Sequence, residues 1–429
     1  MQKKITFPFL LFFISIVICL SFKTIAEEYF SFSNAFNKAI SNSNIIKKNE
    51  FLLNSKINLI GNSYSSKDWN LDFTSSFTLD NKKLDNIGDY VDQKTTVNTI
   101  SLEKTLIDSG YTDMSVEIAL NDKKIAHNNL LLAKQDLFIN TLTSYLNVYN
   151  SNKILNLRIS NVKRFNTAVK ASKLKLSAGT ITPTTVSEAE AKLARSEYDL
   201  AISKTEQLNY INEFKSLIGE DFDLKKLKFP EFKYSLPKSI KEAQKLSLNS
   251  NLKIANIFLT KKNAELSKDK QLASSYPSLD IDLYLKNSES DSDSSTSDYS
   301  SYGTTLTFKS SLFRNKSESS LILSLDENYK SVLEEEKELI RVSKLDTLSL
   351  FNNYINSDFN VIAADKEYNA SKLALNGVRK EEEFGLRTLL DVLDREADVM
   401  DAEVRLLKSK SDQLLNKYKL LINIGKYNF

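Results

Sequence analysis

The chain has 429 residues, of which 41% are apolar, and it carries a formal net charge of +3. Its 58 basic residues include three in the first 26, so the remainder balances the 55 acidic residues and does not indicate a nucleic-acid partner. One histidine, His127, and one cysteine, Cys19, exclude histidine metal clusters and disulfides within the chain. No phosphate-loop or dinucleotide fingerprint is present, so we expect neither an enzyme nor a cofactor.

The N-terminus has the pattern of a secretory signal peptide. Two lysines precede an apolar run of 16 residues, 5–20, and a small residue at Ala26 offers a cleavage site. A membrane-spanning helix needs roughly 20 apolar residues, which is longer than this run. A lipoprotein signal has a small residue before its cysteine, whereas Ile18 precedes Cys19. We therefore predict that residues 1–26 are removed on export and that the mature chain contains no cysteine.

Very long helices follow from the scarcity of glycine and proline. The first half predicts a helix over about 31–62, two β-like runs, a 68-residue stretch without helix breakers between Gly110 and Gly179, and a helix over 184–218. The second half predicts the same series, with helices over about 238–273 and 388–424. As one helix, the 68-residue stretch would extend roughly 100 Å. Periodic helices of such length are typical of coiled coils.

Apolar residues also follow a seven-residue repeat, with alternating spacings of four and three. In the last helix the repeat runs through Leu393, Ala397, Met400, Val404, Leu407, Ser411, Leu414, Tyr418 and Leu421. Only Ser411 is polar. This pattern predicts a seam along which another helix packs and supercoils.

The two halves are copies of one another. Four residues recur after 206 positions, namely Leu106, Gly179, Val186 and Gly219 as Leu312, Gly385, Val392 and Gly425. Such a long period indicates a duplication rather than a solenoid repeat. Pro230 and Pro237 mark the linker, and we predict one structural repeat over residues 27–229 and a second over 230–429.

The β-like runs lie at about 69–77, 95–106, 279–285 and 302–313. Their alternation of apolar and polar residues is typical of membrane β-strands, although a half-buried strand in a soluble sheet has the same pattern. Because membrane barrels have at least about eight strands, four strands would have to be pooled among several chains, and three chains would supply twelve. The serine-rich and acidic segment 287–301 predicts a mobile, solvated loop, with only a faint similarity to a calcium-binding loop.

Several segments together resemble the outer membrane efflux protein family, the TolC family. These are LFINTLTSYLNVYN at 137–150, AGTITPTTV at 178–186 and GLRTLLDVLD at 385–394. The resemblance implies a mainly α fold with a membrane β part, in which a long α-helical coiled-coil barrel in the periplasm continues into a twelve-stranded outer-membrane β-barrel of a homotrimer. It also implies the exit duct of a tripartite efflux pump or type I secretion system. Its partners would be a periplasmic adaptor, an inner-membrane transporter and outer-membrane lipid.

The resemblance further places a gate at the helix tips, around turns at Gly179, Pro183 and Gly385. Asp391 and Asp394 match an acidic selectivity ring, because they share one helix face and a threefold pore would present six carboxylates. The residues alone favour a different interpretation, in which both are solvated acids that complement a helix dipole, and it is the resemblance that favours the ring.

The expected lock of this gate departs from the family pattern. Arg387 matches the gate-locking arginine of the family, and Thr184 matches one of that arginine's partner positions. Where the family can carry an aspartate and a tyrosine, this chain has Thr185 and Glu382, so a tyrosine–aspartate bond cannot form. Arg387 could pair with Glu381, Glu382 or Glu383 instead. The remaining alternatives are a soluble periplasmic coiled-coil adaptor, which would not need four strands, and a secreted enzyme, for which we find almost no support.

Overall fold

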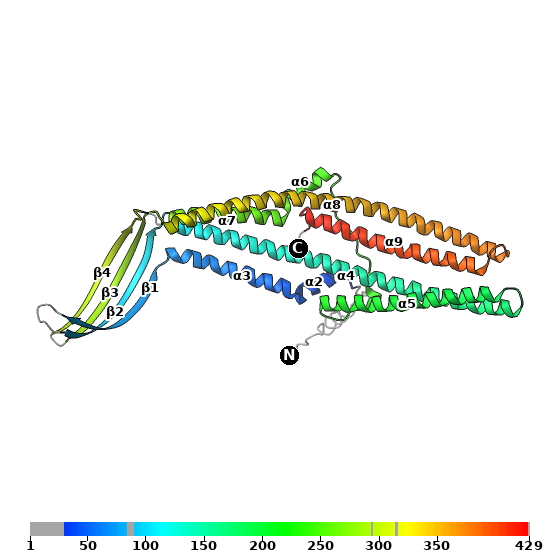
Figure 1. Cartoon of the computed structure of the whole chain (residues 1–429), viewed down its shortest axis with the longest axis horizontal. Helices are drawn as coiled ribbons and strands as arrows, with labels where there is room; N and C mark the ends of the chain where they lie inside the picture. Colours follow the sequence, from blue (N-terminus) through cyan, green and yellow to red (C-terminus); the bar gives the residue numbers. More distant parts are fainter. Residues whose placement is uncertain (1–29, 84–89, 293–294, 314–315, 428–429) are drawn as a thin grey trace, which may run out of the picture. The chain divides into compact units, whose positions relative to one another are not determined.

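The computed structural model describes residues 30–83, 90–292, 295–313 and 316–427, so the predicted signal peptide with Cys19 lies outside the described residues. The same order of elements occurs in both halves of the chain (Figure 1). The first half contains α2 (Phe32–Asn42), α3 (Asn44–Tyr64), the 3-10 helix η1 (Ser65–Lys67), β1 (Asn70–Lys83), β2 (Tyr90–Ile107), α4 (Tyr111–Ser177), α5 (Pro183–Ile218) and the 3-10 helix η2 (Leu224–Lys226). The second half contains α6 (Ile240–Ser250), α7 (Leu252–Ala273), β3 (Ser278–Ser292), β4 (Ser295–Lys309), α8 (Lys316–Glu383) and α9 (Leu389–Asn423).

The two very long helices are present, with 67 residues in α4 and 68 in α8. The helices expected over about 31–62 and 238–273 are each divided in two, whereas those expected over 184–218 and 388–424 are continuous. Ser43 accepts a hydrogen bond from the backbone N–H of Ile46, and Asn251 accepts one from that of Lys253. Each side chain thus caps a new helix, because it satisfies a backbone donor that has no partner within the helix.

The residues form two compact units, and neither unit coincides with one half of the chain. The first unit comprises the described residues up to Asn42 together with Asn140–Lys233 and Val361–Ser411. The second comprises Ser43–Ile139, Tyr234–Asn360 and Asp412 onward. Each unit therefore takes segments from both halves, and the division at residues 229 and 230 stays a prediction about the origin of the sequence.

The second unit contains one antiparallel sheet with the strand order β1-β2-β3-β4. The central pairing joins the two halves of the chain, since Ile100 of β2 lies opposite Leu285 of β3. The expected loop over 287–301 was wrong, because β3 and β4 continue through most of this segment, with Asn287 opposite Ser300. Composition shows only that the segment cannot bury apolar surface, whereas a hairpin is held by backbone hydrogen bonds that need no buried side chains.

The first unit has an aromatic core around Tyr145, which packs with Phe214, Ala35 and Ile218. The hydroxyl of Tyr145 lies 3.0 Å from the carbonyl oxygen of Phe30 and 2.8 Å from that of Lys228, and it accepts a hydrogen bond from the Lys228 N–H. Burial raises the pKa of Tyr145 to about 12, so the hydroxyl keeps its proton and can donate it at neutral pH.

Elsewhere in the first unit, the polar member of the heptad seam has a partner. Ser411 and Asn150 are both buried, and the Asn150 amide nitrogen lies 2.9 Å from the Ser411 hydroxyl. A buried polar pair of this kind favours one register between two helices. Among the described residues, no helix combines the length and the apolar character needed to cross a membrane.

We predict that Tyr145→Phe destabilises the first unit, because two backbone carbonyls and one N–H lose a buried partner. Leaving such groups unpaired costs about 1–3 kcal/mol. Thermal unfolding of the purified protein measures the effect. Tyr198→Phe is the control, since Tyr198 is 66% exposed and its substitution should leave the midpoint unchanged. Equal midpoints for both variants would contradict the prediction.

Candidate functional site at the helix tips

Four of the predicted site residues lie in the turn between α4 and α5 or at the start of α5, namely Gly179, Pro183, Thr184 and Thr185. Gly179 has φ +68°, a left-handed conformation that favours glycine, and its N–H bonds the carbonyl of Leu176 at 2.9 Å. Pro183 begins α5, where its missing N–H leaves no helical bond unmade. Thr185 lies two residues after Pro183, and its hydroxyl is 3.2 Å from that of Thr182.

The turn between α8 and α9 repeats this geometry. Gly385 has φ +75°, and its N–H bonds the carbonyl of Glu382 at 2.9 Å. Two large apolar side chains, Phe384 and Leu386, are 79% and 75% exposed on this turn. The chain thus presents two helical hairpins, α4–α5 and α8–α9, that end in closely similar turns (Figure 1).

Asp391 is bound at the start of α9. Its carboxylate accepts hydrogen bonds from the Thr388 N–H and hydroxyl, both at 2.8 Å, and the Asp391 N–H bonds the Thr388 hydroxyl oxygen at 3.2 Å. The bonds from Thr388 lower the pKa of Asp391, so this carboxylate is charged at neutral pH. Within one chain, Asp391 and Thr388 thus form reciprocal capping bonds at the start of α9.

Asp394 forms an ion pair with Lys192 of α5, so this carboxylate joins the two hairpins. A second ion pair joins them near the turns, with 3.6 Å between Lys175 of α4 and Glu382 of α8. Sequence reasoning missed both lysines. They lie 202 and 207 residues from their partners and belong to no motif, so a single sequence carries no signal for the pairing.

Arg387 does not join the hairpins within the chain. Its Nε lies 2.9 Å from a carboxylate oxygen of Glu381, on the same hairpin, which selects the first of the three glutamates considered from the sequence. The bond with Glu381 raises the pKa of Arg387 further above its ordinary value. Glu382 is thus bound to the α4–α5 hairpin by its ion pair with Lys175, whereas Arg387 binds only within the α8–α9 hairpin.

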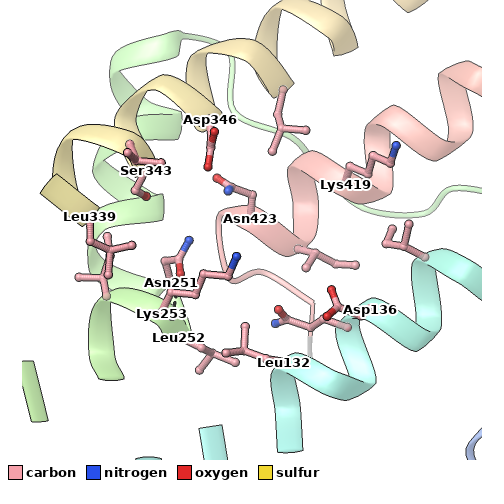
Figure 2. Close-up of a pocket in the computed structure, with 16 residues that line it drawn as sticks. Leu132, Asp136, Asn251, Leu252, Lys253, Leu339, Ser343, Asp346, Lys419 and Asn423 are labelled. Carbon is pink, nitrogen blue, oxygen red and sulfur yellow. Dashed lines mark hydrogen bonds between the residues drawn. The ribbon is translucent and has the colours of Figure 1, made fainter. Parts of the chain in front are cut away.

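A separate cavity of about 280 Å³ lies in the second unit (Figure 2). Its labelled side chains come from α4, α7, α8, α9 and the junction before α7, and the charged ones are Asp136, Asp346, Lys253 and Lys419. Two of its asparagine side chains have structural hydrogen bonds: Asn251 caps α7, and Asn423 accepts a hydrogen bond from the Thr347 hydroxyl. Among the described residues, no group of three or more His, Cys, Asp or Glu side chains is arranged to hold a metal ion.

The chain is similar to one known protein family over part of its length and to solved structures over nearly all of it. A model of the family described as outer membrane efflux protein matches residues 67–220. Three solved structures each match 92% of this chain. The CmeC outer membrane channel of Campylobacter jejuni has a TM-score of 0.77 and 14% sequence identity over 85% of its own chain. The outer membrane protein VceC of Vibrio cholerae (14% identity, 96% of its chain) and the open MtrE outer membrane channel of Neisseria gonorrhoeae (15% identity, 88% of its chain) both have TM-scores of 0.74. No curated protein matches the sequence.

The fold is therefore that of the TolC-like outer-membrane channels, with a mainly helical chain and four antiparallel strands. The family resemblance predicted from the sequence is confirmed over residues 67–220, and the solved structures share the fold over nearly the whole chain. The family consists of transport channels rather than enzymes, and its description gives the outer membrane as its location, which agrees with the predicted one.

Proposed function

We propose that three copies of this chain form the exit duct of a tripartite efflux pump or type I secretion system, with a passive channel that is gated at the helix tips. The observation that carries the proposal is the four-stranded sheet. Its outer strands, β1 and β4, each have one neighbour within the described residues. In a membrane every backbone N–H and C=O needs a partner, so two such edges must be paired by other chains.

One face of the sheet supports placement in a membrane. Its large apolar side chains are Leu71, Phe73, Phe77 and Leu79 on β1, Ile100 and Leu102 on β2, Leu279, Ile281, Leu283 and Leu285 on β3, and Tyr302, Leu306 and Phe308 on β4. We call this group the apolar band. Residues on the opposite face, such as Asp72, Ser101, Asp282 and Thr305, are polar. An apolar exterior and a polar interior are typical of a membrane barrel that encloses water.

The apolar band runs diagonally across the strands. On β1 it extends up to Leu79, which lies in register with Thr296 of β4 through Lys94 and Asp291. On β4 the band begins only at Tyr302, six positions further along the strand. Barrel strands tilted by about 35–45° would displace a level band by roughly three to five residues over three strand steps. The diagonal therefore supports tilted strands in a closed barrel.

The helix tips support the remaining parts of the proposal. In a trimer, Asp391 and Asp394 would supply six carboxylates to one ring at the periplasmic entrance. The exposed Phe384 and Leu386 would give a periplasmic adaptor an apolar contact at the same end. An inner-membrane transporter would supply the energy. Arg387, Thr184, Thr185 and Glu382 remain the proposed lock residues. Within the single chain, Glu382 is paired with Lys175 and Arg387 with Glu381, so a lock to a neighbouring copy would exchange these partners.

The apolar band predicts which positions lipid covers. Leu306 is 63% exposed in the chain and belongs to the band, whereas Ser300 is exposed on the same face beyond it. In cells, a membrane-impermeant maleimide should label Ser300→Cys and leave Leu306→Cys unlabelled until detergent is added. The predicted mature chain has no other cysteine that could react. Equal labelling of both variants in intact cells would contradict the membrane placement.

The acidic ring predicts cation selectivity. Replacing Asp391 and Asp394 together with asparagine should shift the reversal potential in a salt gradient towards zero and weaken block by multivalent cations, because the pore entrance loses its negative field. Planar-bilayer recordings measure both properties. Asp221→Asn is the control, since it removes one charge from a residue far from the tips in sequence, whose side chain is 88% exposed. A double variant with unchanged selectivity would overturn the ring assignment.

A further inference from the structure

A buried carboxylate lies two residues beyond Asp394. Glu396 of α9 is the only charged side chain among the described residues that is buried, with 8% of its surface exposed. A carboxylate that leaves water needs charged or hydrogen-bonding partners in return, and its removal from them is strongly unfavourable. The partners of Glu396 therefore identify contacts on which the arrangement of the helices depends.

Two arginines from different hairpins bind the two oxygens of Glu396. Arg379 of α8 donates a hydrogen bond to Oε1 at 2.5 Å, and this arginine belongs to the same hairpin as Glu396. Arg164 of α4 belongs to the other hairpin, and its Nη1 lies 3.9 Å from Oε2. The first contact is a short, charge-assisted hydrogen bond, whereas the second is an ion pair too long to be a hydrogen bond.

The surroundings allow the weaker contact to separate. Beside Glu396, α4 and α9 are separated by a groove of about 360 Å³, lined by Arg164, Thr167 and Val392 among others. Next to the groove, a small apolar cluster of Phe165, Ala168 and Leu393 is the close packing between the hairpins. Where helices are not closely packed, an ion pair can be lost without opening a new cavity.

The other ion pairs between the hairpins have more exposed carboxylates than Glu396. Their carboxylates, Glu382, Asp394 and Asp401, retain 27%, 57% and 50% of their side-chain surface, whereas the Glu396 side chain retains 9%. Exposed pairs are screened by water and salt and contribute little. Among the carboxylates that pair between the hairpins, Glu396 is thus the one that water screens least.

We propose that Glu396 is a positioning residue of the gate, in which Arg379 is its permanent partner and Arg164 is the contact released when the two hairpins separate. The proposal rests on the proposed channel function and names residues outside the predicted lock. While Arg164 is bound, α9 is held against α4 close to the entrance. After its release, Arg379 still neutralises the carboxylate, so the α8–α9 hairpin moves as one piece.

Single-channel recording of the full-length protein in planar bilayers tests this assignment. Arg164→Gln should give a several-fold higher resting conductance, while thermal stability changes little because the Arg379–Glu396 bond remains. Arg164→Lys keeps the charge and should restore the closed resting state. Arg405→Gln is the matched control, since Arg405 is as exposed as Arg164 but pairs with Glu367 on its own hairpin. It should leave the resting conductance unchanged.

The outcomes separate the two proposals. If the wild-type protein forms no channel, the proposed function fails. If the wild type conducts and Arg164→Gln has the same resting conductance as the wild type, the release of Arg164 is refuted while the channel function stands. An equal rise in Arg405→Gln and Arg164→Gln would also refute it, because the effect would then not depend on a contact between the hairpins.

Discussion

The requirement that buried backbone groups find hydrogen-bond partners governs this chain more than any single side chain does. In a lipid environment a sheet with two unpaired edges is not viable, because no water is available to the edge N–H and C=O groups. The chain supplies four strands, in the order β1-β2-β3-β4, and its two outermost strands have one neighbour each among the described residues. Oligomerisation is therefore part of the proposed fold rather than an addition to it.

The same requirement makes the two halves of each chain depend on one another. The central pair of strands, β2 and β3, comes from different halves of the sequence, so neither half forms the sheet alone. Both compact units likewise combine segments of the two halves. A duplicated sequence has thus become one interdependent structure, in which each hairpin of long helices ends at an equivalent glycine, Gly179 or Gly385, with a left-handed backbone.

Near the helix tips, three acidic residues of α9 form hydrogen bonds and ion pairs beside a small apolar cluster. Asp391 is held by Thr388 within its own helix start, whereas Asp394 and Glu396 bind residues of the other hairpin. Three acids within six residues thus have different roles, and only Glu396 is buried. The proposed gate would thus combine a small apolar contact with several separate ion pairs.

Much of the fold could be predicted from the sequence because its signals are periodic. Heptads, missing helix breakers and the recurrence of Gly179 as Gly385 are all visible along the chain. The helix divisions at Ser43 and Asn251 were missed because a capping residue resembles any other polar residue within a long periodic segment. The continuation of β3 to Ser292 and the start of β4 at Ser295 were missed, because backbone pairing leaves no trace in composition. Pairs such as Lys192–Asp394 join residues that are 202 positions apart, and no local pattern encodes them.

The central claim is that several chains pool their strands to close one barrel. Native mass spectrometry of the detergent-extracted protein tests it most directly, because it counts the chains in the intact particle. The account predicts a single dominant species of three chains, which together supply twelve strands. The three chains should separate only under conditions that also unfold the sheet. A folded, stable single chain in the outer membrane extract, with its four strands intact, would contradict the account.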